Sequence, residues 1–138
     1  MNRSALFVTL VPPVAISALI WGFWNLPYTP FRLAGLVLLA IGISFLTIAR
    51  FQLGDSFSVK PEAKALVTGG LYSKIRNPVY VFACFVLAGL FLYLERPALL
   101  FLLFPLIVLQ VSRARAEARV LEEKFGEEYR AYRARTWF

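Results

Sequence analysis

The side chains best suited to chemistry in this 138-residue chain gather in two short polar segments. The first, residues 66–80, combines a Gly-Gly pair with lysine, arginine, asparagine and two tyrosines. The second, residues 113–132, carries arginines and glutamates beside aromatic side chains. Taken alone, each has an ordinary structural explanation. Asn77 can cap a helix that begins at the following proline, and Arg113 and Glu117 have the i,i+4 spacing of a helical ion pair.

Several kinds of chemistry are disfavoured by the residues that the chain lacks. It has no histidine and one cysteine, Cys84, which lies in an apolar run, so neither a metal site nor an intrachain disulfide is expected. Basic residues do not alternate with aromatic ones in the manner of a nucleic-acid-binding surface, so no nucleic-acid partner is expected. The apolar runs hold no Asp, Glu, Lys or Arg, whereas proton-coupled transporters place ionisable groups within the bilayer. Any chemistry is therefore expected at the two polar segments.

The rest of the chain is composed like a membrane protein. Hydrophobic residues make up 59% of it, charged residues only 17%, and the mean hydropathy is +0.67. A soluble domain is about 45–50% apolar and about 25% charged. Because a spanning helix needs about 20 apolar residues, the four runs without charge predict a single domain, residues 1–138, with an all-α integral membrane fold. The expected spans are residues 5–24, 31–48, 79–94 and 98–112.

Three features describe how these spans are connected. Only residues 95–97 separate the last two runs, which predicts a tight helical hairpin. The loop 50–78 is long for a compact protein but keeps apolar and aromatic residues, so we expect it to fold under the bundle. The tail 113–135 is predicted to be an amphipathic helix that Gly126 bends or breaks. Its apolar stripe recurs at helical spacing and consists of Ala114, Ala118, Leu121, Phe125 and Tyr132.

The distribution of charge predicts the orientation in the membrane. Of the 15 basic residues, 13 fall on the side that holds the N-terminus, the loop 50–78 and the tail, and only Arg32 and Arg96 fall on the other. The positive-inside rule therefore places both termini and the loop in the cytoplasm. The N-terminal run contains a Pro-Pro pair and lacks a convincing cleavage site, so we interpret it as a retained first helix and not a signal peptide.

Read together, the two polar segments resemble the isoprenylcysteine carboxyl methyltransferase family, which belongs with the membrane phospholipid methyltransferases. The pattern is Leu-Val-Thr-x-Gly-x-Tyr, then Arg-x-Pro-x-Tyr at the start of a hydrophobic hairpin, then Glu-x-x-x-Leu-x-x-x-Phe-Gly-x-x-Tyr-x-x-Tyr. The resemblance covers residues 58–138. It implies a methyltransferase that binds S-adenosylmethionine at the cytoplasmic face and receives its methyl acceptor from the lipid.

The resemblance also implies positions for the site. It places the substrate-contacting arginine on Arg113, and it makes Arg113 and Glu117 the catalytic candidates. It places the cofactor contacts on Lys64, Ala65, Leu66, Val67, Tyr72, Asn77, Pro78, Val79, Tyr80 and Glu117.

The chemistry of these residues is compatible with that cofactor. The Glu117 carboxylate can hold the ammonium of its zwitterionic methionine part, and free amides at the start of the helix at Asn77 can hold its carboxylate. The apolar members of the set can pack against the adenosine, and Tyr80 can face the sulfonium by cation–π attraction.

The chain departs from the family pattern at two of its positions. Asn77 replaces the usual histidine between Arg and Pro, and Ala118 replaces a second glutamate. Asparagine cannot shuttle a proton, which favours a carboxylate acceptor of the prenylcysteine type, held by Arg113. Two alternatives remain: methylation of a phospholipid amine, and a non-enzymatic four-helix membrane protein.

Overall fold

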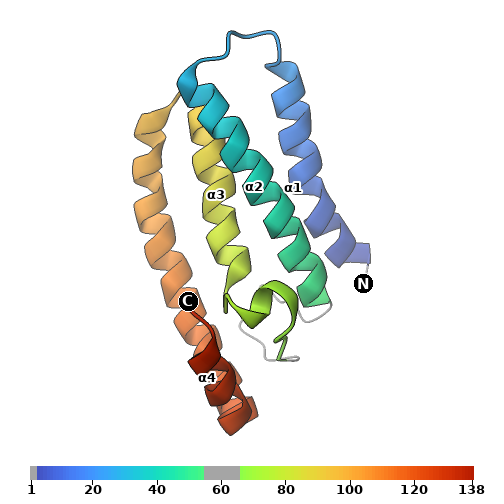
Figure 1. Cartoon of the computed structure of the whole chain (residues 1–138), viewed down its shortest axis with the longest axis vertical. Helices are drawn as coiled ribbons and strands as arrows, with labels where there is room; N and C mark the ends of the chain where they lie inside the picture. Colours follow the sequence, from blue (N-terminus) through green and yellow to red (C-terminus); the bar gives the residue numbers. More distant parts are fainter. Residues whose placement is uncertain (1–2, 55–65) are drawn as a thin grey trace.

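The computed structural model describes residues 3–54 and 66–138, and every regular element within these ranges is helical. The described residues form four α-helices. They run side by side along the long axis of the molecule (Figure 1). They are α1 (Arg3–Gly22), α2 (Pro30–Leu53), α3 (Pro78–Tyr93) and α4 (Leu103–Arg135). Two short 3-10 helices, η2 (Gly70–Ser73) and η3 (Pro97–Leu102), precede α3 and α4. The predicted all-α fold is confirmed.

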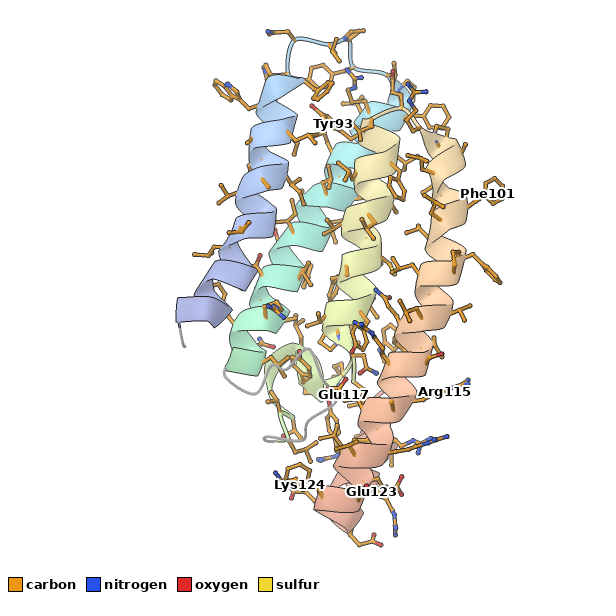
Figure 2. All side chains as sticks on the ribbon, turned by 180° about the vertical axis from the view of Figure 1, so that it is seen from behind. Tyr93, Phe101, Arg115, Glu117, Glu123 and Lys124 are labelled. Atoms are coloured by element: carbon orange, nitrogen blue, oxygen red, sulfur yellow. The ribbon has the colours of Figure 1, made fainter. Side chains whose placement is uncertain are left out.

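The helices present an apolar exterior. Two stretches are long and apolar enough to cross a bilayer, namely the 24 residues of α2 and the 39 residues from η3 through α4. The helix α3 and the Pro13–Gly22 part of α1 are shorter and also apolar. Phe101, which projects from the outer side of the bundle in Figure 2, is 84% exposed, and Phe104 is 74% exposed. Such a surface is suited to lipid and not to water, in agreement with an integral membrane protein.

The helix boundaries differ from the sequence prediction at two places. The helix α2 continues to Leu53, five residues past the expected end at 48, and stops where Gly54 adopts a φ of 52°. The fourth run does not begin as an α-helix, because residues 97–102 form the tighter 3-10 helix η3. Pro97 has no N–H to donate, and no side chain caps the start of η3. The α-helix then begins at Leu103 and continues into the charged tail as far as Gly126, where the backbone leaves the helical conformation.

The contact between α2 and α3 forms the rigid centre of the bundle. A Cβ atom added to Gly35 would lie 2.4 Å from the Tyr93 backbone nitrogen, and one added to Gly89 would lie 2.7 Å from that of Leu39. Such distances are possible only without a side chain, so the two helices approach backbone to backbone. Leu39, Val86 and Tyr93 form the buried core around this contact.

A buried arginine fastens the end of the bundle that lies away from the polar segments. Arg32 is 5% exposed; its Nε donates to the Tyr93 carbonyl at 3.3 Å, and its Nη1 donates to the Pro27 carbonyl at 3.1 Å. Its Nη2 also lies 3.6 Å from a Glu95 carboxylate oxygen, and the Thr29 hydroxyl donates to the same carboxylate. The positive charge of Arg32 is thus compensated where α2 begins and α3 ends, and its contacts hold these two helix ends together.

Candidate functional site

A pocket lies at the opposite end of the bundle, between the segment that carries η2, the start of α3 and the charged half of α4. Both polar segments singled out from the sequence contribute to it, so the fold brings them together. Its lining residues are Leu53, Leu66, Val67, Tyr72, Arg76, Asn77, Ala114, Glu117, Ala118, Leu121, Tyr129 and Tyr132.

A sharp reversal at Gly126 builds one wall of this pocket. Gly126 has a φ of 49° and a ψ of −118°, a conformation that is unfavourable for residues with a Cβ. In Figure 1 the chain turns at the foot of α4, and the C-terminus returns to the level of the loop that carries η2. Arg130 joins the two limbs through its Nε, which lies 3.0 Å from a Glu122 carboxylate oxygen. The reversal carries Tyr129 and Tyr132 to the pocket.

The returning C-terminal residues pair with the segment before α3. The Trp137 amide donates to the Lys74 carbonyl at 3.0 Å, and the Arg76 amide donates to the Trp137 carbonyl at 3.0 Å. The Asn77 amide donates to the Phe138 carbonyl at 2.8 Å. These bonds form a short parallel bridge that holds the entry into α3 in place.

A buried side-chain bond closes the same wall further in. The Tyr132 hydroxyl donates to the Tyr72 carbonyl at 2.8 Å. Burial raises the pKa of Tyr132 to about 12, so its hydroxyl remains a donor near neutral pH. This bond links the C-terminal helix to η2 across the pocket.

The start of α3 agrees only in part with the expectation from sequence. Asn77 occupies the N-cap and Pro78 the first helical position, but the Asn77 side chain makes no capping hydrogen bond. The Asn77 amide is engaged by Phe138, Pro78 has no N–H, and the Tyr80 amide donates to the Asn77 carbonyl. Neither the Asn77 amide nor Pro78 is therefore available to hold a carboxylate, contrary to the expectation for these two positions. The Asn77 side chain, by contrast, lines the pocket.

Glu117 is the acid that faces the pocket. Figure 2 shows it on the side of α4 turned toward the loop of η2, while Arg115 points away from the bundle. The Tyr80 hydroxyl donates to a Glu117 carboxylate oxygen at 3.4 Å. Burial raises the pKa of Glu117, and the hydrogen bond from Tyr80 partly offsets that rise. A half-buried carboxylate of this kind gains stability from a cation.

Arg113 lies on the rim and not in the pocket. It is exposed, although its guanidinium is within electrostatic range of the Tyr80 hydroxyl. The structure describes both Arg113 and Glu117 and places Glu117 against Tyr80, without an ion pair between the two charged residues. The simple interpretation of their spacing as an i,i+4 pair is therefore wrong.

Two buried hydroxyls in the pocket have no hydrogen-bond partner among the described residues. They belong to Tyr72, which is 6% exposed, and to Tyr129, which is 0% exposed. Burial raises the pKa of each, so both stay protonated near neutral pH and can donate. Because buried polar groups in proteins are nearly always paired, these two donors are candidates for hydrogen bonds to a bound ligand.

The positions implied by the resemblance divide into three groups. Leu66, Val67, Tyr72, Asn77 and Glu117 line the pocket. Pro78 is buried, Val79 and Tyr80 are half-buried in the first turn of α3, and Arg113 is exposed at the rim. Lys64 and Ala65 lie outside the described residues.

Sequence reasoning assigned no role to several lining residues. Arg76, Tyr129 and Tyr132 belong to the motifs that carried the resemblance, but their hydroxyl and guanidinium groups were not assigned to the site. The sequence does contain one indication of where the two tyrosines lie. Tyr129 and Tyr132 are at helical spacing at the end of the apolar stripe, which predicts that their hydroxyls lie on a buried face.

Comparison with known proteins places the chain in one family. The sequence profile described as phospholipid methyltransferase matches residues 31–128, which is well over half of the chain. The match runs from the start of α2 to Glu128, two residues past the reversal at Gly126. No curated protein and no solved structure matches the chain.

Proposed function

The chain belongs to the phospholipid methyltransferase family, and on that premise we propose that it methylates a lipid-like acceptor with S-adenosylmethionine at the cytoplasmic face of a membrane. Membership of this family makes the chain a membrane methyltransferase. The identities of the cofactor and of the acceptor are what we propose. The observation that supports it is the pocket itself, whose lining combines Glu117 with two buried tyrosine hydroxyls that have no partner among the described residues.

The residues present fit the proposed cofactor. Burial makes ionisation of Glu117 unfavourable, and the ammonium of a bound amino-acid group would relieve that penalty. Tyr72 offers a donor with no partner among the described residues, suited to a ribose hydroxyl or a ring nitrogen. Leu66, Val67 and Leu121 give the pocket apolar walls against which an adenine ring can pack.

S-adenosylmethionine, when bound, supplies an electrophilic methyl group. The role of the protein is then to position the cofactor and the acceptor and to exclude water. Glu117 holds the positive end of the amino-acid group, and the ring of Tyr80, whose hydroxyl donates to Glu117, is the aromatic group that we assign to the sulfonium. Arg113, exposed at the rim, is free to hold the acceptor as it approaches from the lipid.

A carboxylate acceptor of the prenylcysteine type suits this set of side chains best. An acceptor oxygen bonds to the methyl carbon as the carbon–sulfur bond breaks, and no proton has to leave. A protonated amine would first have to lose a proton, and the chain has no histidine to take it. Amine methylation of a phospholipid is the second candidate, because the matching family profile is that of phospholipid methyltransferases. In that reaction Glu117 would have to accept the proton.

Two measurements on the full chain in detergent test the proposal. Isothermal titration calorimetry should detect binding of S-adenosylmethionine, and no heat at millimolar cofactor would reject the proposed cofactor. Transfer of a radiolabelled methyl group to a farnesylcysteine analogue, compared with transfer to phosphatidylethanolamine, identifies the acceptor. Labelling of phosphatidylethanolamine alone would reject the carboxylate acceptor and favour the second candidate.

A further inference from the structure

Tyr129 is a pocket residue whose chemistry the proposed function leaves unused. Its side chain is fully buried, it lines the pocket, and its hydroxyl has no partner among the residues that the structure describes. Its ring is fixed against that of Tyr132, with centroids 6.2 Å apart and planes at 53°. A buried hydroxyl without a partner destabilises a fold. Its presence is understandable if a ligand atom accepts its hydrogen bond.

Arg76 brings a positive charge to the same pocket. Its backbone is held by the bond from its amide to the Trp137 carbonyl. Its guanidinium makes no ion pair with any carboxylate in residues 3–54 and 66–138. Burial raises the pKa of Tyr129, and the Arg76 guanidinium acts in the opposite direction, which places the two groups within electrostatic reach. A cation and a neutral donor therefore share one part of the pocket.

Glu117 supplies the opposite charge. It lines the same pocket from the other limb of α4 and carries the carboxylate that faces Tyr80. The lining of the pocket thus includes a cation, a neutral hydroxyl donor and an anion. This distribution is complementary to a zwitterion.

We propose that Arg76 and Tyr129 form an anion subsite that binds the α-carboxylate of the cofactor, while Glu117 binds its ammonium. This inference rests on the proposed function and adds two residues to it. The subsite takes the place of the Asn77 amide, which donates to Phe138, and of Pro78, which has no N–H.

An anionic oxygen in this subsite could also come from the phosphate of a phospholipid headgroup. The carboxylate is favoured because the residues around Arg76 and Tyr129 are those that fit the cofactor, whereas Arg113, which fits the acceptor, lies outside the pocket. Both sources share one chemistry, an oxyanion that accepts from a guanidinium and a phenol.

Calorimetry with two cofactor probes tests the assignment on the full chain in detergent. S-adenosylmethionine carries the carboxylate, and decarboxylated S-adenosylmethionine lacks it but keeps the ammonium. We expect Tyr129→Phe to weaken binding of the first probe roughly 10-fold or more and to leave binding of the second unchanged. Arg76→Gln should show the same selectivity and gives a second, independent variant. Tyr28→Phe, exposed at the other end of the bundle, is the matched control and should change neither.

Thermal unfolding without ligand gives a readout that does not depend on binding. Because Tyr129→Phe removes a buried hydroxyl that has no partner among the described residues, the variant should melt at the same or a higher temperature than the parent. A lower melting temperature together with equal losses for both probes would mean that the hydroxyl is structural, and would overturn the subsite.

The remaining outcomes separate the subsite from the proposed function. If the parent binds S-adenosylmethionine and both variants bind it equally well, the subsite is wrong and the proposed function stands. If the variants instead keep the parent affinity for both cofactor probes and lose only affinity for phosphatidylethanolamine in mixed detergent micelles, the subsite binds the headgroup phosphate and the carboxylate assignment is overturned. If the parent binds neither cofactor probe, both proposals fail.

Discussion

Glu117→Gln removes the negative charge that the proposed function places against the ammonium of the cofactor. Glutamine keeps the size of the side chain and can still accept the hydrogen bond from the Tyr80 hydroxyl, which is 3.4 Å long in the parent. A hydrogen bond to a charged group contributes about 1.5–3 kcal/mol. Because Glu117 is half-buried and not fully dry, we take about 2 kcal/mol, or roughly a 30-fold loss of affinity.

The same substitution should have the opposite effect on stability. Burial holds the pKa of folded Glu117 above its ordinary value. A group of this kind contributes stability at low pH that is lost as the pH rises through the folded pKa. At neutral pH the free parent therefore carries the cost of a buried charge, and Glu117→Gln should unfold at the same or a higher temperature. Loss of affinity without loss of stability distinguishes a binding residue from a structural one.

Calorimetry with S-adenosylmethionine and thermal unfolding without it are the two assays. Glu123→Gln is the matched control, because Glu123 lies on the same helix, is exposed, and loses the same charge. We expect it to change neither measurement. If Glu117→Gln binds the cofactor as tightly as the parent, Glu117 does not hold the ammonium, and the assignment of this pocket is wrong even though the family membership stands.

Four further predictions follow from the same geometry. Calorimetry from pH 4.5, the ordinary pKa of glutamate, to pH 8 should show parent affinity for the cofactor rising with pH as Glu117 ionises, and no such rise in Glu117→Gln. Arg113→Lys keeps the charge but loses the planar fork, so methyl-transfer assays should show a raised KM for the acceptor with unchanged cofactor affinity. Gly126→Ala forces a φ of 49° on a residue with a Cβ, so thermal and denaturant unfolding should reveal a loss of about 1–3 kcal/mol and weaker cofactor binding. A tag after Phe138 should be protease-accessible only from the cytoplasmic side, and access from outside intact cells alone would refute the charge-based orientation.

The helices could be predicted because their signal is local. Each of the first three apolar runs lies in one α-helix, the fourth is divided between η3 and α4, and the turn after α3 falls at residues 95–97, which separate the last two runs. The ends were less predictable. The helix α2 passes the polar Arg50 and Gln52, where composition indicated a loop, because the Gln52 side chain finds a partner in the Leu71 amide at 2.8 Å. That contact joins residues 19 positions apart, and no local pattern encodes it.

The parts of the site that escaped prediction depend on long-range main-chain contacts. The bridge between Trp137 and Ile75 uses backbone groups that every sequence possesses, so side-chain patterns give no sign of it. Gly126 was recognised as a bend, but the direction in which the chain returns depends on packing against η2. For the same reason the engagement of the Asn77 amide and the position of Tyr129 became visible only in the structure.

The pocket concentrates groups that are individually unfavourable in the free protein. Glu117 carries a charge that burial opposes, and the hydroxyls of Tyr72 and Tyr129 are buried without partners among the described residues. Each of these costs would be removed by one zwitterionic ligand, since its ammonium satisfies the carboxylate and its oxygens accept from the hydroxyls. The rigid contact between α2 and α3 and the buried Arg32 lie at a distance from this region and supply the stability that the pocket lacks. A stable membrane frame is thus separated from a pocket that holds unpaired buried groups, as in binding sites that trade stability for function.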